Sequence, residues 1–157
     1  MIEPDDLEEW ISEKDDKKID LKRDVKHRPG EAWMTSAQLK CVLGWLGASP
    51  GWFAARCETT LRTVVRWCDG HSPIPESAIA ELEKIVAHTE ATLVSTLASV
   101  DQGCTTVLRT YRTDDEFWVA TGSAEYPASW HRMIVARMMD QLLCATSHVV
   151  RIEYEDT

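Results

Sequence analysis

The sequence has no run that approaches the roughly 20 apolar residues needed to cross a bilayer. Its first residues, 1–6, are acidic and lack an apolar segment, so we expect no secretory signal, a cytoplasmic location and no membrane partner. It also lacks a glycine-rich phosphate loop and the HExxH, GxSxG and EF-hand motifs. The five histidines stand singly, which is typical of structural or exposed histidines. We therefore predict no catalytic residues and a protein that is not an enzyme.

Paired cysteines are missing as well, because the five cysteines form no CxxC pair. Cys57, Cys68 and His71 could be imagined as a zinc site, but their spacing fits no structural zinc pattern in full. In a cytosolic protein such cysteines are reduced and mostly buried thiols. We expect no metal site and no cofactor.

Positive charge is scarce, since the net charge is -9, and its distribution matters more than its sum. Residues 34–75 are the only net-positive segment, with 4 bases and 2 acids. Residues 1–33 carry a net charge of -4 and residues 76–157 carry -7. The middle segment is thus the one place where composition favours an anionic partner, and such binding should be strongly salt-sensitive.

Within that segment the pattern predicts three short helices. Thr35 or Ser36 should cap the first helix, which runs through Leu46 and ends at Gly47. Ser49, followed by a proline, should open the second helix over 51–57. Thr60 should cap the third helix, 60–68, with a glycine just past its end.

The third helix has one apolar and one polar face. Val64 and Trp67, three residues apart, should point into the core. The exposed face would then consist of Leu61, Arg62, Thr63 and Arg66. Two arginines, a short hydroxyl and a leucine could read the major groove of DNA, although an ordinary surface helix could carry the same residues.

The rest of the chain predicts a long helix over 76–100 and then a different kind of layer. Strands are expected over 105–112 and 148–155, with a short helix over 114–120 and a longer one from about 126 to 143 between them. The fold class is therefore mostly α with a small α+β tail. We divide the chain into an acidic N-terminal extension (1–33), a helical DNA-binding domain (34–102) and a strand-helix-helix-strand dimerisation domain (103–157).

The tail is expected to pair with a second copy, because an isolated pair of strands is marginally stable. In the last strand, alternation places its apolar residues on one face and leaves the other face wet. The residues expected at this homodimer interface are Tyr111, Trp130, Val150, Ile152 and Tyr154.

The helical segment resembles the Cro/xenobiotic-response type of helix-turn-helix proteins. The resemblance lies in residues 39–47, 49–54 and 60–70, and it extends through Pro73-Ile74-Pro75. The chain departs from the family pattern at Glu58, where the turn between the second and third helices usually has glycine, and at Pro50, where a phosphate-contacting glutamine is common.

This resemblance implies a homodimeric transcriptional repressor of bacteria or phage that binds an inverted repeat in double-stranded DNA, often in its own promoter. Base reading would fall to Leu61, Arg62, Thr63 and Arg66. Phosphate contacts would come from Ser49, Trp52, Thr60, His71 and Ser72.

The order of elements, with Tyr111-Arg112 and the run 129–132, is also similar to anti-CRISPR-associated autorepressors, whose tail is a dimerisation domain. The alternative function is a protein-interaction module, such as an antitoxin or antirepressor, that reuses the helix-turn-helix fold. The acidic extension, 1–33, could then bind a protein partner.

Overall fold

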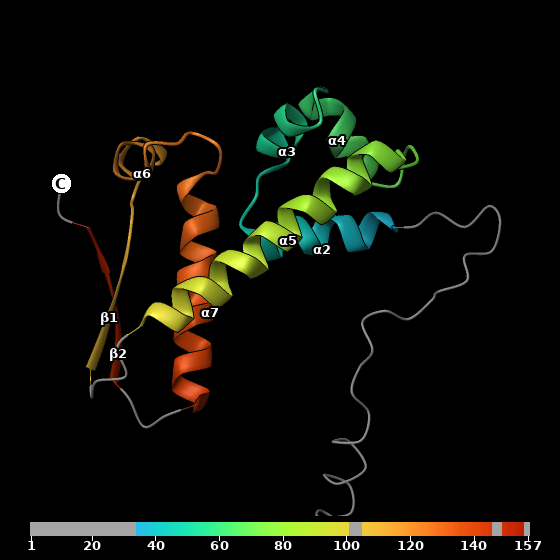
Figure 1. Cartoon of the computed structure of the whole chain (residues 1–157). Helices are drawn as coiled ribbons and strands as arrows, with labels where there is room; N and C mark the ends of the chain where they lie inside the picture. The colour runs from blue at the N-terminus through green and yellow to red at the C-terminus, as the bar shows by residue number, and fades with distance from the viewer. Residues whose placement is uncertain (1–33, 101–104, 146–148, 156–157) are drawn as a thin grey trace, which may run out of the picture. The chain divides into compact units, whose positions relative to one another are not determined.

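The computed structural model describes residues 34–100, 105–145 and 149–155, and the expected extension, 1–33, lies outside them. The described residues form six helices and one parallel pair of strands, so the expectation of a mostly helical protein with a small strand-containing tail is confirmed (Figure 1). No helix among the described residues is both long and apolar enough to span a membrane.

The first three helices begin where the sequence predicts. Helix α2 (Ser36–Leu46) starts at Thr35, whose hydroxyl accepts the backbone N–H of Gln38. Helix α3 (Pro50–Arg56) is capped by Ser49, and helix α4 (Leu61–Cys68) by Thr60. Each cap satisfies a backbone donor that the first turn would leave unpaired, which is why such short helices have defined starts.

The turn between α3 and α4 has an unusual backbone at Glu58. Its φ is 51°, in the left-handed region that glycine adopts without cost. Two backbone hydrogen bonds hold this turn, from the N–H of Glu58 to Ala55 and from the N–H of Thr59 to Ala54. The turn therefore holds a left-handed conformation although the residue is a glutamate.

Helix α5 (Glu76–Ser99) confirms the long helix expected over 76–100. Its inner stripe is buried and consists of Ala78, Ile79, Leu82, Ile85, Thr89 and Leu93. Thr89 is tolerated in this stripe because its hydroxyl donates to the carbonyl of Ile85 at 2.7 Å.

The C-terminal part contains strand β1 (Thr105–Thr110), helix α6 (Asp114–Thr121), helix α7 (Ala128–Ala145) and strand β2 (Val149–Tyr154). A capping box formed by Thr113 and Glu116 starts α6. The two strands are parallel and in register, with Thr106 beside Val150 and Leu108 beside Ile152. Parallel pairing follows from the two helices between the strands, which carry the chain back to the same end of the sheet.

The two strands are buried to different degrees. In β1, Thr106, Leu108 and Thr110 are buried in the regular alternation of a half-covered strand. In β2, Ile152 and Tyr154 remain 41% and 45% exposed, and Val150 is half-buried. The strand itself is confirmed, but a single copy does not bury the apolar face that its alternation predicts.

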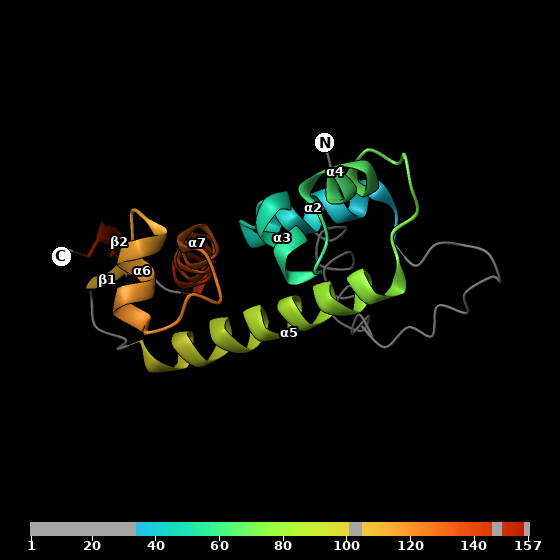
Figure 2. The ribbon, with the colours of Figure 1, turned by 90° about the horizontal axis from the view of Figure 1, so that it is seen from above.

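Helix α7 lies between the strand pair and the N-terminal helices in both views (Figures 1 and 2). Trp130 of α7 is only 5% exposed, stacks on Tyr126 and donates its indole N–H to Thr89 at 2.9 Å. The sequence predicted Trp130 at a dimer interface, but little of its side chain is accessible to a second copy. Its large apolar ring is buried in the core of its own chain.

Candidate nucleic-acid interface

Helix α4 separates buried from exposed residues as its pattern predicts. Val64 is fully buried and Trp67 is 7% exposed, so both belong to the core. Leu61 is 55% exposed, and Arg62 and Arg66 are also exposed. Val65 (40% exposed) joins this face and Thr63 is half-buried, so the exposed face of α4 is slightly more apolar than the sequence suggested.

Arg62 and Arg66 differ from every other lysine and arginine in the described residues, because neither has a hydrogen-bond, ion-pair or ring partner there. They stand four residues apart on one helix face, where two like charges destabilise a helix by a few tenths of a kcal/mol. Lysines and arginines that do have partners are Lys40, Arg56, Lys84, Arg109, Arg112, Arg132, Arg137 and Arg151.

The other two bases of the net-positive segment are engaged within the fold. Lys40 pairs with Asp69 at 2.8 Å, and the hydrogen bond and charge of this lysine lower the pKa of the Asp69 carboxyl. Arg56 bridges Glu81 at 2.8 Å and Glu125 at 2.9 Å. Only the two arginines of α4 therefore leave positive charge uncompensated in this segment.

The hydroxyls at the start of α4 already have partners. Thr60 accepts the backbone N–H of Thr63 at 3.2 Å, and the two hydroxyl oxygens lie 2.9 Å apart. This arrangement fixes the first turn, on which Leu61 and Arg62 stand. Thr60 can still offer an oxygen to a ligand, but its main role in this structure is to cap the helix.

Trp52 is the predicted phosphate contact that fits its assignment least well. Its indole N–H donates to the carbonyl of Glu125 at 3.2 Å, and its ring lies 5.6 Å from that of Tyr126. The donor that would reach a phosphate is thus used inside the protein. Trp52 is better described as part of the contact between α3 and the segment before α7.

The remaining predicted phosphate contacts lie around the ends of the short helices. Ser49 caps α3 by accepting the backbone N–H of Trp52 at 3.1 Å. His71 is exposed and Ser72 is half-buried just after α4. The backbone N–H of His71 bonds to the carbonyl of Arg66, which holds this loop against the end of the helix that carries the arginines.

Helix α2 contacts α7 at Gly47, and we call the contact between Gly47 and Ser129 the joint. The Ser129 hydroxyl donates to the Gly47 carbonyl at 2.6 Å, and a Cβ on Gly47 would lie 2.5 Å from the Ser129 carbonyl oxygen. Nearby, the Arg137 guanidinium donates to the Trp45 carbonyl and lies over the Trp45 ring. Nothing in the sequence pattern indicates these contacts, because their partners are more than 80 residues apart.

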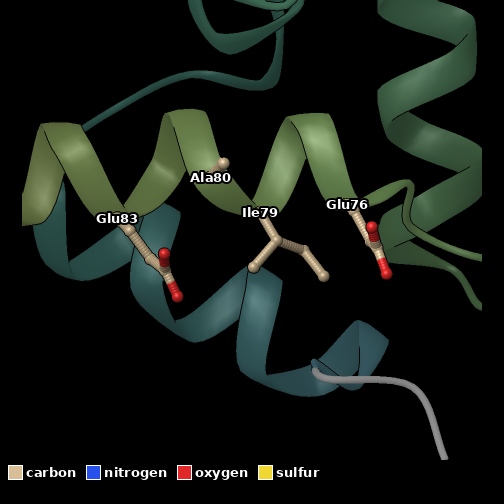
Figure 3. Close-up of a pocket in the computed structure, with 4 residues that line it drawn as sticks. All are labelled: Glu76, Ile79, Ala80 and Glu83. Carbon is tan, nitrogen blue, oxygen red and sulfur yellow. The ribbon is translucent and has the colours of Figure 1, made fainter.

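A hollow of about 240 Å³ on α5 has the wrong charge for a phosphate. It is lined by Glu76, Ile79, Ala80 and Glu83, and the two glutamates flank Ile79 along one side of the helix (Figure 3). Carboxylates repel a phosphate backbone, so this hollow is not a second nucleic-acid contact. Among the described residues, no group of three or more side chains that could bind a metal comes together. Burial raises the pKa of the Cys68 thiol, which disfavours the thiolate form that binds metals.

No protein-family model matches this sequence, and a search of curated proteins finds no match.

Proposed function

We propose that this protein is a sequence-specific DNA-binding repressor of the helix-turn-helix type, in which α3 and α4 form the motif and α4 enters the major groove. One observation carries the proposal: within the described residues, the two cations without a partner stand together on the exposed face of α4. A fold gains nothing from two adjacent, unpaired arginines, whereas an anionic ligand gives both a partner.

The chemistry of this face suits base recognition. Arginine can bind the O6 and N7 atoms of guanine with two parallel hydrogen bonds, which is the commonest specific contact in the major groove. The exposed methyl groups of Leu61, and the methyl of Thr63, suit contact with thymine methyls. Ser49, Thr60, His71 and Ser72 are candidates for phosphate contacts from the flanking turns.

Two copies are needed for the regulatory part of the proposal. A homodimer would present two α4 helices to successive major grooves, about 34–36 Å apart, and would read an inverted repeat. Occupation of a promoter by such a dimer blocks transcription, and the family resemblance favours the protein's own promoter as the target.

The test is a binding series with the DNA upstream of the protein's own gene and with a pool of random duplexes. Arg62→Ala and Arg66→Ala should each weaken binding to the selected site by roughly 5- to 150-fold, equivalent to about 1–3 kcal/mol, and relax base choice at one position. Arg109→Ala is the matched control, because Arg109 is an exposed arginine on β1 that pairs with Glu155.

Two outcomes would contradict the proposal. One is a wild-type protein that forms no salt-sensitive, sequence-specific complex with any duplex of the pool, which would favour the protein-interaction alternative. The other is normal binding by both α4 variants, which would move the reading surface away from α4.

A further inference from the structure

Strand β2 has one edge that no described residue covers with hydrogen bonds. The N–H of Glu155 donates to the carbonyl of Thr110 on β1 at 2.8 Å, so odd-numbered residues of β2 direct their backbone groups toward β1. Because this direction alternates along a strand, the N–H and C=O groups of Val150, Ile152 and Tyr154 point to the open edge. An open row of this kind is a template for pairing with another strand.

The side chains on the α7 side of this edge are apolar and incompletely covered. Ile152 and Tyr154 lie beside a hollow of about 310 Å³, whose other walls include Thr110 and Val135. Both side chains are more than 40% exposed, although their strand faces the same helix as the buried residues of β1. The apolar layer of the sheet is therefore unfinished at this edge.

The opposite face of β2 carries one charge of each sign. Arg151 and Glu153 stand two residues apart on this face, 3.8 Å from each other, and Arg151 is exposed whereas Glu153 is half-buried. A strand with this arrangement is self-complementary when it meets a second copy running in the opposite direction, since each arginine can then lie beside the other copy's glutamate.

We propose that two copies pair through β2, antiparallel and centred on Ile152, so that the two strand pairs merge into one four-stranded sheet. In this register Ile152 faces its own counterpart and Val150 faces Tyr154 of the second copy. Arg151 faces Glu153 of the second copy, twice in the dimer. The proposal deepens the dimer of the proposed function, but the pairing itself does not depend on DNA.

Charge and strand length together favour this register over its neighbours. A shift that centres the pair on residue 151 sets two arginines opposite each other. A shift to residue 153 sets two glutamates opposite each other and leaves Val150 without a facing strand residue, although Arg151 would then face Glu155 of the second copy. Centring on Ile152 also pairs all three residues whose backbone groups point to the open edge, Val150, Ile152 and Tyr154. Each facing pair then forms about two backbone hydrogen bonds. The free edge of β1 offers no such choice, because its only charged residue is Arg109.

The test is a charge exchange followed by light scattering of the full chain across a range of concentrations, without DNA. Arg151→Glu and Glu153→Arg should each weaken dimerisation roughly tenfold or more, because each sets like charges face to face twice. The double variant should dimerise like the wild type. An equimolar mixture of the two single variants should form a heterodimer, since every facing pair is then of opposite sign.

A disulfide reports the register directly. Ile152→Cys should give covalent dimers under mild oxidation, whereas Val150→Cys should not, because the two copies of residue 150 would lie four residues apart along the strand. The two variants share all native cysteines, so each controls for the other.

A monomeric wild type, or charge variants that dimerise normally, would overturn the β2 pairing. Those results would leave base reading by Arg62 and Arg66 untouched, because the variants of α4 and of β2 are measured separately. Conversely, a charge-dependent dimer that binds no DNA would preserve the pairing and refute the proposed function.

Discussion

The two helices α3 and α4 are similar in length and joined by a short turn, but their cationic side chains have opposite environments. Arg56 of α3 bridges two carboxylates and lies 5.6 Å from the centre of the Tyr126 ring. Arg62 and Arg66 of α4 have no partner among the described residues. We therefore call Arg56 the paired arginine, and Arg62 and Arg66 the unpaired arginines.

The difference separates cations that the fold uses from cations that the fold leaves unpaired. A half-buried arginine is retained where carboxylates repay its desolvation, as Glu81 and Glu125 do for Arg56. Exposed, unpaired arginines at helical spacing contribute nothing to the fold. Net charge alone would not find them, since the whole chain is acidic.

The largest effect is expected at the joint between Gly47, at the end of α2, and Ser129 of α7. Gly47→Ala should lower the free energy of unfolding by roughly 2–4 kcal/mol, because residue 47 has a φ of 65° and the added Cβ would meet the Ser129 carbonyl. Urea unfolding followed by circular dichroism measures this loss. Gly44→Ala is the control, since a Cβ there meets nothing within 4 Å and should stabilise α2. Equal behaviour of the two variants would mean that the joint is not formed.

A smaller change in stability should distinguish the paired arginine from the unpaired ones. Arg56→Met should destabilise the fold by about 1–2 kcal/mol, because it leaves the carboxylate of Glu81, only 18% exposed, without its main partner. Arg66→Met removes a like-charge neighbour of Arg62 and should leave stability unchanged or slightly higher. Thermal unfolding of both variants at low and high salt makes the comparison. A loss of stability in Arg66→Met would show that this arginine has a structural partner.

The smallest effect is expected at the turn between α3 and α4. Glu58→Gly should raise the stability by about 1 kcal/mol, because glycine adopts the left-handed conformation without the steric cost that glutamate bears. Glu58→Ala keeps that cost and serves as the control. Should the glycine variant be less stable than the alanine variant, the turn would not hold the backbone found here.

Local features were predictable from the sequence, and long-range contacts were not. The caps at Ser49 and Thr60 were identified correctly, and that of α2 was narrowed to Thr35 or Ser36, because capping depends on the four or five residues around it. The burial of Val64 and Trp67 followed from their spacing in a single helix. Within the described residues, the six helices and two strands were predicted for the same reason, but the way they pack against one another could not be predicted.

The assignments that fit the structure least well concern residues whose environment is set by distant parts of the chain. Trp130 was expected at a contact between copies, but it is buried by Tyr126 and Thr89. Trp52 was expected to contact phosphate, but the carbonyl of Glu125 takes its N–H. Periodicity reports which face of a helix is apolar and cannot report what covers that face. The assignments of Arg62, Arg66 and the edge of β2 remain predictions that binding and dimerisation measurements will test.

For the proposed DNA-binding dimer, the joint between Gly47 and Ser129 would limit the spacing of half-sites that the protein accepts. Helices α2 and α7 touch directly at this joint. A pair of copies joined through β2 would therefore hold its two α4 helices at a fixed distance. One extra base pair between half-sites turns one of them by about 35° and moves it by about 3.4 Å. A dimer with a rigid joint cannot follow that change. One spacing between half-sites should therefore be strongly preferred over spacings one base pair longer or shorter.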